Sequence, residues 1–249
     1  MAEVIAFAPG GYRYIKAVFQ YSSGAAAAPG FAIERVRLKR PLPLAEGFAA
    51  VEAHLRKLGR PTTAFCACEL RSPAPFTEQG FYDFNRHYVQ TLERWGLYRD
   101  GENPVARTNV CPLYEPPSVP SLYAFSYTVS AAPGLDGGFV IAGSGETQQG
   151  ATPAERIVAH GDLSPEGMAR KIRHVMAEME RRLSALGLSW SDVTATQAYT
   201  VRDIGGLIEE LIVRRGAAAG GLTWHFAAPP IRDLEFEMDV RALARESVL

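Results

Sequence analysis

One arginine of this chain stands at the start of an expected strand rather than among other charges. Arg107, in ENPVARTNV (102–110), follows polar turn residues, and a run typical of a β-strand begins beside it. Its neighbour Ala106 is small, so a ligand could approach the side chain. A guanidinium presents a planar fork of N–H donors that fits a carboxylate with two parallel hydrogen bonds. The alternative for Arg107 is an ion pair with a structural carboxylate at a sheet edge.

Glutamates supply the second candidate chemistry, which is the handling of a proton or of an attacking water. Glu237 alternates with apolar residues in LEFEMDV (234–240), and Asp239 belongs to the same alternation. Glu146 lies in GSGETQQG (143–150), a glycine-rich turn that follows a strand-like run, where it could reach a ligand. That turn lacks the lysine and the spacing of a phosphate loop, so it predicts no nucleotide site.

The histidines and cysteines predict no metal site. The five histidines show no metal-ligand spacing, and among them His225 is the one weighed as a catalytic base. Cys66 and Cys68 are two residues apart and share a face of their expected strand, but no second pair matches them. Together with Cys111 they are expected to be buried small side chains rather than a disulfide framework.

Composition narrows the class of protein. The chain has 249 residues, of which 47% are hydrophobic, which suits one large domain or two of ordinary size. Its 26 basic and 27 acidic residues give a net charge of −1, so nucleic acid is not an expected partner. The N-terminus lacks the basic region of a signal peptide, and no apolar run has the length of a membrane span. We therefore expect a soluble, cytoplasmic protein.

The chain repeats one order of elements twice, namely strands, helix, strand, helix, strands. Two amphipathic helices are predicted at 44–59 and 164–187, with apolar residues at helical spacing. Ser164 is placed to cap the second of them, and both end in Leu-Gly, at Gly59 and Gly187. The other expected helices and strands are residues 14–23, 31–38, 63–70, 76–96, 106–112, 121–130, 137–145, 192–201, 203–216, 221–227 and 234–240. A turn-rich segment at 130–138 separates the two repeats.

This order predicts an α+β fold of two tandem units, residues 1–130 and 134–249. Each unit is expected to be a mixed sheet with two helices on one face. The other sheet face would then be bare, with aromatic residues such as Phe125, Tyr127 and Phe226 in need of cover. We therefore expect one sheet to pack against another, either between the halves or between subunits.

Several motifs resemble those of one protein family. GGFVIAGSG (137–145) is similar to a strand of that family that ends in Ser-Gly, and residues 160–203 are similar to its long helix and following strand. LEFEMDVRALA (234–244) resembles the last strand of that family. In the first half, GGYRYIKAV (10–18) and ARTNV (106–110) resemble two shorter motifs. The family is Rid, also called YjgF-like, whose fold resembles that of a bacterial chorismate mutase.

The resemblance implies roles for individual residues. In deaminating Rid proteins the arginine at the position of Arg107 grips the carboxylate of an imino or enamino acid, and Tyr14 matches the tyrosine of the opening motif. Gly220 or Gly221 occupies the place of that arginine in the second half, whereas Glu237 matches the late acidic residue of the family. We therefore expect the halves to be specialised, with a complete site where they meet.

The function expected from this resemblance is hydrolysis of a small carboxylate-bearing imine or enamine to a carbonyl and ammonia. Arg107 would bind the carboxylate, Glu237 or Glu146 would handle the water or proton, and Tyr14 would close the pocket. No cofactor is expected. Two alternatives remain open, namely a chorismatase-like hydrolase of an enol ether and a non-enzymatic metabolite-binding protein. The resemblance also implies a homo-oligomer, a trimer.

Overall fold

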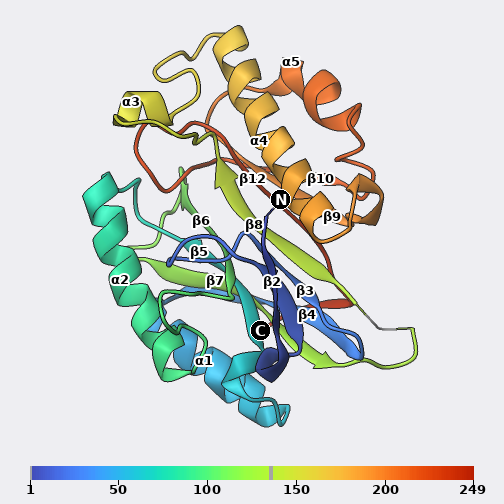
Figure 1. The fold of residues 1–249 in the computed structure, drawn as a ribbon. Helices are drawn as coiled ribbons and strands as arrows, with labels where there is room; N and C mark the ends of the chain where they lie inside the picture. The colour runs from blue at the N-terminus through green and yellow to red at the C-terminus, as the bar shows by residue number, and fades with distance from the viewer. Residues whose placement is uncertain (1, 135–136) are drawn as a thin grey trace.

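The structure is a computed structural model that describes residues 2–134 and 137–249, and its described strands form two sheets (Figure 1). In spatial order the first sheet contains β1 (Val4–Phe7), β2 (Tyr12–Ile15), β3 (Gly24–Ala27), β8 (Phe139–Gly145), β12 (Glu237–Ala242), β9 (Ala195–Tyr199) and β10 (Leu222–His225). The second contains β11 (Ala227–Ala228), β6 (Ala106–Pro112), β5 (Phe65–Arg71), β7 (Ser121–Ser130), β4 (Phe31–Pro43) and β13 (Arg245–Val248). Both sheets mix parallel and antiparallel pairs, so the predicted α+β class is confirmed.

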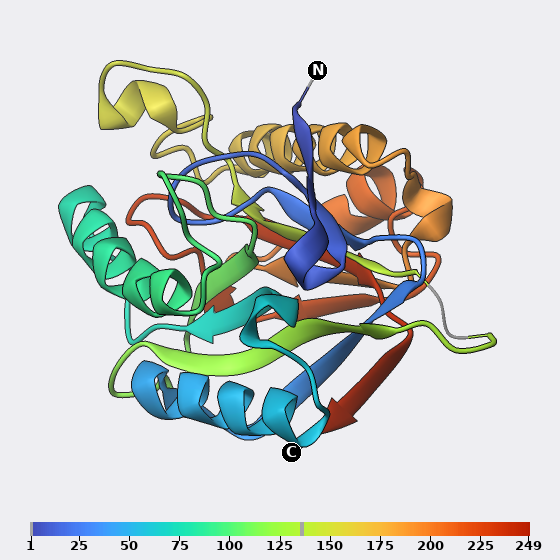
Figure 2. The same ribbon diagram turned by 60° about the horizontal axis from the view of Figure 1, so that its bottom comes forward.

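Helices cover the outer face of each sheet, and the two sheets face one another between them (Figure 2). The helices are α1 (Leu44–Lys57), α2 (Glu78–Arg94), α3 (Pro153–Arg156), α4 (Pro165–Ala185) and α5 (Gly205–Ile208), which continues into a π-helical turn at Glu209–Val213. Helices α1 and α2 cover the second sheet, whereas α4 and α5 cover the first. No helix within these described ranges is both long and apolar enough to cross a membrane.

The ends of the long helices follow from local sequence. Ser164 accepts a hydrogen bond from the Gly167 amide at 3.1 Å, as expected of an N-cap. Gly59 and Gly187 have φ angles of 65° and 74°, the left-handed conformation in which glycine has no steric cost. The helix ends predicted from the sequence are therefore confirmed.

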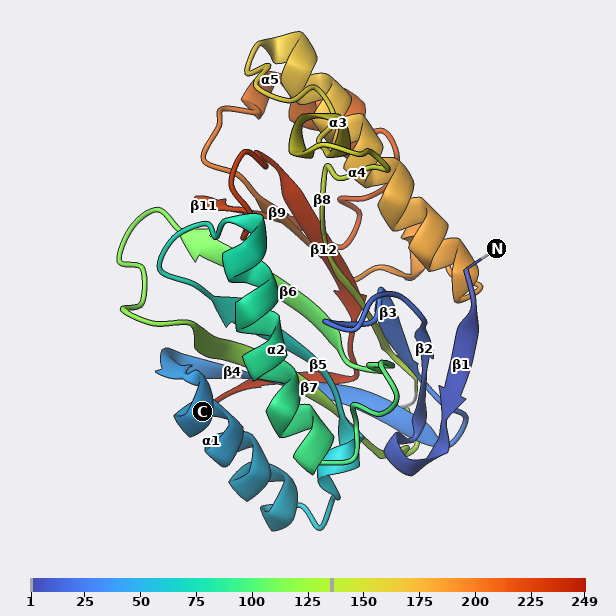
Figure 3. The ribbon, with the colours of Figure 1, turned by 60° about the vertical axis from the view of Figure 1, so that its left-hand side comes forward.

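The two halves of the chain exchange strands across the expected boundary (Figure 3). Strand β3 pairs with β8, so that residues 4–27 extend the sheet of the second half. In return β13 pairs with β4, and the short β11 pairs with β6. The seam predicted at 130–138 includes residues 135 and 136, which lie outside the described ranges.

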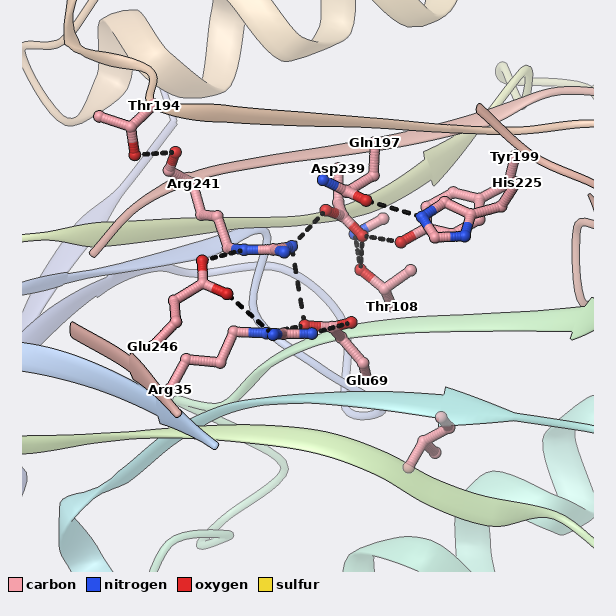
Figure 4. Close-up of polar contacts among 12 residues, drawn as sticks. Arg35, Glu69, Thr108, Thr194, Gln197, Tyr199, His225, Asp239, Arg241 and Glu246 are labelled. Carbon is pink, nitrogen blue, oxygen red and sulfur yellow. Dashed lines mark hydrogen bonds and ion pairs between the residues drawn. The ribbon is translucent and has the colours of Figure 1, made fainter. Parts of the chain in front are cut away.

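The space between the sheets holds a cluster of buried apolar and tyrosine side chains and a network of charges (Figure 4). Thr108 on β6 donates a hydrogen bond to Asp239 on β12 at 2.8 Å, and Arg241 on β12 lies 3.7 Å from Glu69 on β5. Burial alone would raise the pKa of Glu69, but Arg35 and Arg241 lower it to about 2. These ion pairs join the two sheets and hold the inner side of β12 in place.

Three local predictions were wrong. Phe125 and Tyr127 do not lie on the bare face of their sheet but pack beneath α1, in the core of the first half. A register shift in β5 between residues 65 and 67 places Cys66 in the inter-sheet core and Cys68 in the helix-side core, so they do not share a face. Residues 16–23, expected to continue a strand, form none apart from isolated bridges.

Candidate active site

A cavity lies where β6 of the second sheet approaches β8 of the first. Thr108 on β6 accepts a hydrogen bond from the Gly143 amide of β8 at 3.1 Å, which fixes this junction. The walls combine residues from both halves of the chain: Tyr21, Phe81, Arg107 and Asn109 from the first, and Gly143, Ser144, Gly145, Thr147, Arg182, Pro230, Ile231, Leu234 and Glu237 from the second. Arg107 and Glu237, which the sequence placed in different halves, thus line one cavity.

Arg107 is buried in an aromatic surround. Its guanidinium carbon lies 4.7 Å from the ring centroid of Tyr88 and 5.2 Å from that of Tyr21, and two phenylalanine rings of α2 lie within 5.7 Å. Aromatic faces attract a cation but leave most of its N–H groups free to donate hydrogen bonds to another acceptor. The side chain, 3% exposed, has no carboxylate partner among the described residues. The ion pair weighed as the alternative for this residue is therefore not formed within them.

Two donors in this cavity lack acceptors. Arg107 Nη1 and Asn109 Nδ2 are both buried without a hydrogen-bond partner in the described chain. Ser72 donates to Asn109 Oδ1 at 2.9 Å, which orients the amide. A buried donor without an acceptor costs free energy, so such a pair at one cavity wall is suited to an anionic ligand. Residues 107 and 109 are two apart on β6 and therefore project from the same face of the strand.

Glu237 supplies an acid to the same cavity. It is 4% exposed, and its carboxyl group makes no hydrogen bond to any residue within the described ranges. Burial, with a further contribution from Asp239, raises the pKa of Glu237 well above its ordinary value, although Arg107 opposes the shift. A raised pKa favours the protonated form of the carboxyl group, which can donate its proton to a substrate.

A β-bulge makes room for the Glu237 carboxyl. Met238 is opposite Ser144 and Val240 is opposite Ile141, so β8 has one more residue than β12 at this point. A Cβ atom on Gly143 would lie 2.1 Å from Glu237 Oε1, closer than any real contact. Glycine at position 143 is therefore needed for the acid to occupy its place.

A second arginine, Arg182 of α4, reaches the cavity from the helix side of β8. Its Nη1 donates to the Ala142 carbonyl at 3.0 Å, its Nη2 donates to Ser144 Oγ at 3.1 Å, and its Nε donates to Glu178 at 2.6 Å. Sequence reasoning missed Arg182. The available signal was its position in the helix, three residues after the buried Met179 and within the apolar stripe.

Glu146 does not line this cavity. Its carboxylate is fully buried and accepts hydrogen bonds from the backbone amides of Glu235 and Phe236, at 2.7 and 3.1 Å. Lys171 of α4 lies 3.3 Å from it and is equally buried. Burial raises the pKa of Glu146, and the amides and Lys171 oppose that shift. This carboxylate fixes the chain segment that leads into β12 and thereby positions Glu237.

Tyr14 likewise does not line the cavity that contains Arg107. Its hydroxyl donates to Glu102 at 3.1 Å, and it lines a different surface depression. The tyrosines beside Arg107 are Tyr88 of α2 and Tyr21, and Tyr21 lies in the segment 16–23 that was wrongly expected to continue a strand.

His225 lies outside the cavity. It exchanges a hydrogen bond of 2.7 Å with Gln197 and stacks on Tyr199. Burial, with Arg71 nearby, lowers the pKa of His225 to about 4, so the ring is neutral over the physiological range. No group of three or more histidine, cysteine, aspartate or glutamate side chains is placed to hold a metal in residues 2–134 and 137–249.

Comparison with known proteins gives matches over the whole chain. The family model described as 2-aminomuconate deaminase CnbZ matches residues 4–247. A 2-amino-5-chloromuconate deaminase of Comamonas testosteroni is 58% identical over 251 residues, which cover 100% of both chains. A solved chorismatase is 15% identical, with 88% of this chain and 77% of its own covered and a TM-score of 0.45. The YjgF gene product of E. coli is 16% identical, with 43% and 80% covered and a TM-score of 0.32.

Proposed function

This chain belongs to the family of 2-aminomuconate deaminases, and from that premise we propose that it hydrolyses the enamine of an unsaturated amino acid, 2-aminomuconate or a substituted form of it. The observation that carries the proposal is the pair of unpaired donors, Arg107 Nη1 and Asn109 Nδ2, in a cavity that also contains a buried acid. An enamine next to a carboxylate needs both kinds of group.

Arg107 and Asn109 bind the carboxylate next to the amino-bearing carbon. The guanidinium and the amide offer hydrogen bonds from one strand, so the carboxylate is held in a fixed direction. The aromatic side chains around Arg107, among them Tyr21 and Phe81, exclude water and strengthen its attraction for an anion. This placement brings the carbon–nitrogen unit of the substrate toward Glu237.

Glu237 then moves the proton. It protonates a diene carbon, and the nitrogen lone pair forms the C=N bond of an iminium ion as the C=C bond is lost. Water adds to the C=N carbon, and the Glu237 carboxylate takes up a proton from it, which gives a neutral carbinolamine. The hydroxyl proton of the carbinolamine passes to the nitrogen as the C–N bond breaks, so ammonia leaves and a carbonyl remains. Atoms balance with one water, and the reaction is neither an oxidation nor a reduction.

An assay of the purified protein tests this proposal. With 2-aminomuconate we expect stoichiometric ammonia and loss of the diene absorbance of the substrate, whereas chorismate should give no pyruvate. Pyruvate from chorismate would favour a chorismatase-like hydrolase, and saturable binding of 2-aminomuconate without ammonia would favour a metabolite-binding protein. Either result would overturn the deaminase.

Association of several copies, as a trimer, is a separate proposal. Tyr114 and Phe226 are 74% and 51% exposed and lie on neighbouring segments, because the Leu113 amide donates to the Phe226 carbonyl at 2.9 Å. Exposed aromatic side chains of this kind favour a protein contact. Sedimentation equilibrium should give three times the monomer mass, and a stable monomer at micromolar concentration would refute the trimer.

A further inference from the structure

The cavity contains more positive charge than one carboxylate would neutralise. Arg107 has no acidic partner in the described residues, and burial raises the pKa of the Glu237 carboxyl, which favours its neutral form. Arg182 adds a second cation, and its Nη1 donates to the Ala142 carbonyl at the bulge in β8. Each arginine lines the same cavity, but they come from different halves of the chain.

Arg182 shares its one carboxylate partner, Glu178, with another arginine. Burial would raise the pKa of its partner Glu178, but Arg181 and Arg182 lower it to about 2, so Glu178 is ionised. That one carboxylate is shared by the two arginines, with contacts of 2.6 Å to each. Two cations and one anion leave one positive charge in the group. Arg181 is exposed and does not line the cavity, whereas Arg182 is buried at its wall.

The donors of Arg182 and Ser144 are arranged to serve a ligand. Arg182 uses one hydrogen of Nη2 on Ser144 Oγ, and the other is not assigned to a protein acceptor among the described residues. Ser144 accepts that bond, and its own hydroxyl hydrogen has only a long contact of 3.4 Å, to the Gly145 carbonyl. A carboxylate at this point would receive one hydrogen bond from each side chain.

We propose that Arg182 and Ser144 form a second carboxylate subsite and that this subsite makes the protein selective for linear dicarboxylates. The proposal rests on the proposed function, because Arg107 and Asn109 hold the carboxylate beside the reacting carbon and leave Arg182 for the far end. A dianion would then neutralise both uncompensated cations. A monocarboxylate would leave Arg182 and Ser144 without their ligand, in a site that excludes water.

Two stable compounds test the subsite directly. Muconate and sorbate share a six-carbon diene chain, but muconate ends in a second carboxylate where sorbate ends in a methyl group. By titration calorimetry we expect the wild-type protein to bind muconate at least about 30-fold more tightly than sorbate, the lower range for loss of a buried charged partner. Similar affinities for the two compounds, or no detectable binding of muconate, would overturn the subsite.

Variants assign the selectivity to named residues. Ser144→Ala and Arg182→Lys should each reduce the muconate-to-sorbate ratio by about tenfold or more, whereas the matched neighbour Arg181→Ala should preserve it. Arg107→Lys should weaken the binding of muconate and of sorbate by the same factor and leave the ratio of their affinities unchanged. These conservative changes are chosen because Arg182→Ala would also release the carbonyls of the β8 bulge. A ratio that survives both Ser144→Ala and Arg182→Lys would place the selectivity elsewhere.

The same protein preparation separates this inference from the proposed function. Ammonia release from 2-aminomuconate with equal binding of muconate and sorbate would refute the subsite and leave the deaminase intact. Selective binding of muconate without ammonia release would support the subsite and refute the deaminase.

Discussion

Arg107 combines two features that are rarely found together, a fully buried cation and a donor without an acceptor. The four aromatic rings around it stabilise the charge without occupying its N–H groups. The residue is therefore prepared for an anion before any ligand arrives.

Replacement of this arginine should impair catalysis strongly. Arg107→Ala should lower kcat/KM for 2-aminomuconate by about 30-fold to several thousandfold, because a buried charged contact contributes on the order of 2–5 kcal/mol. Arg107→Lys should recover only part of the loss, since a point charge lacks the planar fork. Steady-state kinetics checks this, with the exposed Arg214→Ala as a control. Unchanged kcat/KM in Arg107→Ala would show that the carboxylate is bound elsewhere.

Glu237 should make both activity and stability depend on pH. Its folded-state pKa is raised, so the stability that its proton provides is present below the unfolded pKa of about 4.3 and is lost as pH rises through the folded pKa. The Glu237→Gln side chain has no proton to lose. As pH rises through that window, the melting temperature of the variant should therefore increase relative to that of the wild type. Wild-type kcat should fall over the same upper range, where the acid is lost.

Melting temperatures measured across pH, together with turnover, test this expectation. Glu235→Gln is a suitable control, because Glu235 lies two residues earlier and pairs with Arg202 outside the cavity. Glu237→Gln should abolish most turnover, whereas the control should retain it. Parallel pH curves for wild type and Glu237→Gln would mean that Glu237 titrates normally and is not the stored acid.

At the scale of elements, the bulge in β8 links the strand geometry to the chemistry. Gly143→Ala would place a methyl group against Glu237 Oε1, at 2.1 Å, and near Thr108 Cγ2, at 3.1 Å. The carboxyl must then move, so kcat should fall about tenfold or more, since small displacements of a positioned group are costly. Gly206→Ala is the matched control, because nothing lies within 4 Å of a Cβ there. Normal kcat in Gly143→Ala would refute the positioning argument.

The contact between α4 and the segment before β12 gives a separate prediction. Lys171→Met leaves the Glu146 carboxylate buried without its cation, and removal of one partner of such a pair costs about 3–5 kcal/mol. The double change Glu146→Gln with Lys171→Met should recover part of this, because no uncompensated charge remains. Urea denaturation measures both. If Glu146→Gln abolished turnover while stability stayed unchanged, Glu146 would have a catalytic role that its position does not indicate.

Local sequence patterns predicted the positions of the helices and strands better than they predicted which strands pair. Apolar spacing and the glycines at 59 and 187 located the long helices, because both signals are local. The pairing of β3 with β8 joins residues more than a hundred positions apart, and no local pattern encodes it. Arg107 and Glu237, which line the candidate site, could be proposed from the sequence because they begin or alternate along strands. Arg182 was not, because one more charge in a charged helix resembles an ordinary exposed residue.

At the scale of the whole molecule, strand exchange makes each half depend on the other. Ile15 and Ala26 of the first half belong to the core that α4 covers, and β13 of the second half completes the edge of the other sheet. We expect neither residues 1–133 nor 134–249 to fold when produced alone. Circular dichroism and proteolysis test this, and co-expression of the two pieces should restore deaminase activity. A stable, cooperatively folded single half would show that the boundary separates independent domains.

The exchange also sets an order of events during synthesis. Residues 4–27 leave the ribosome long before β8 at residues 139–145 exists to pair with them, and β4 gains β13 only after residues 245–248 have been made. Domains often fold as they emerge, but neither sheet of this chain can be completed until distant segments have been synthesised. The nascent chain therefore exposes strand edges during much of translation, and its production in cells should depend on chaperones that shield those edges until residues 245–248 have emerged.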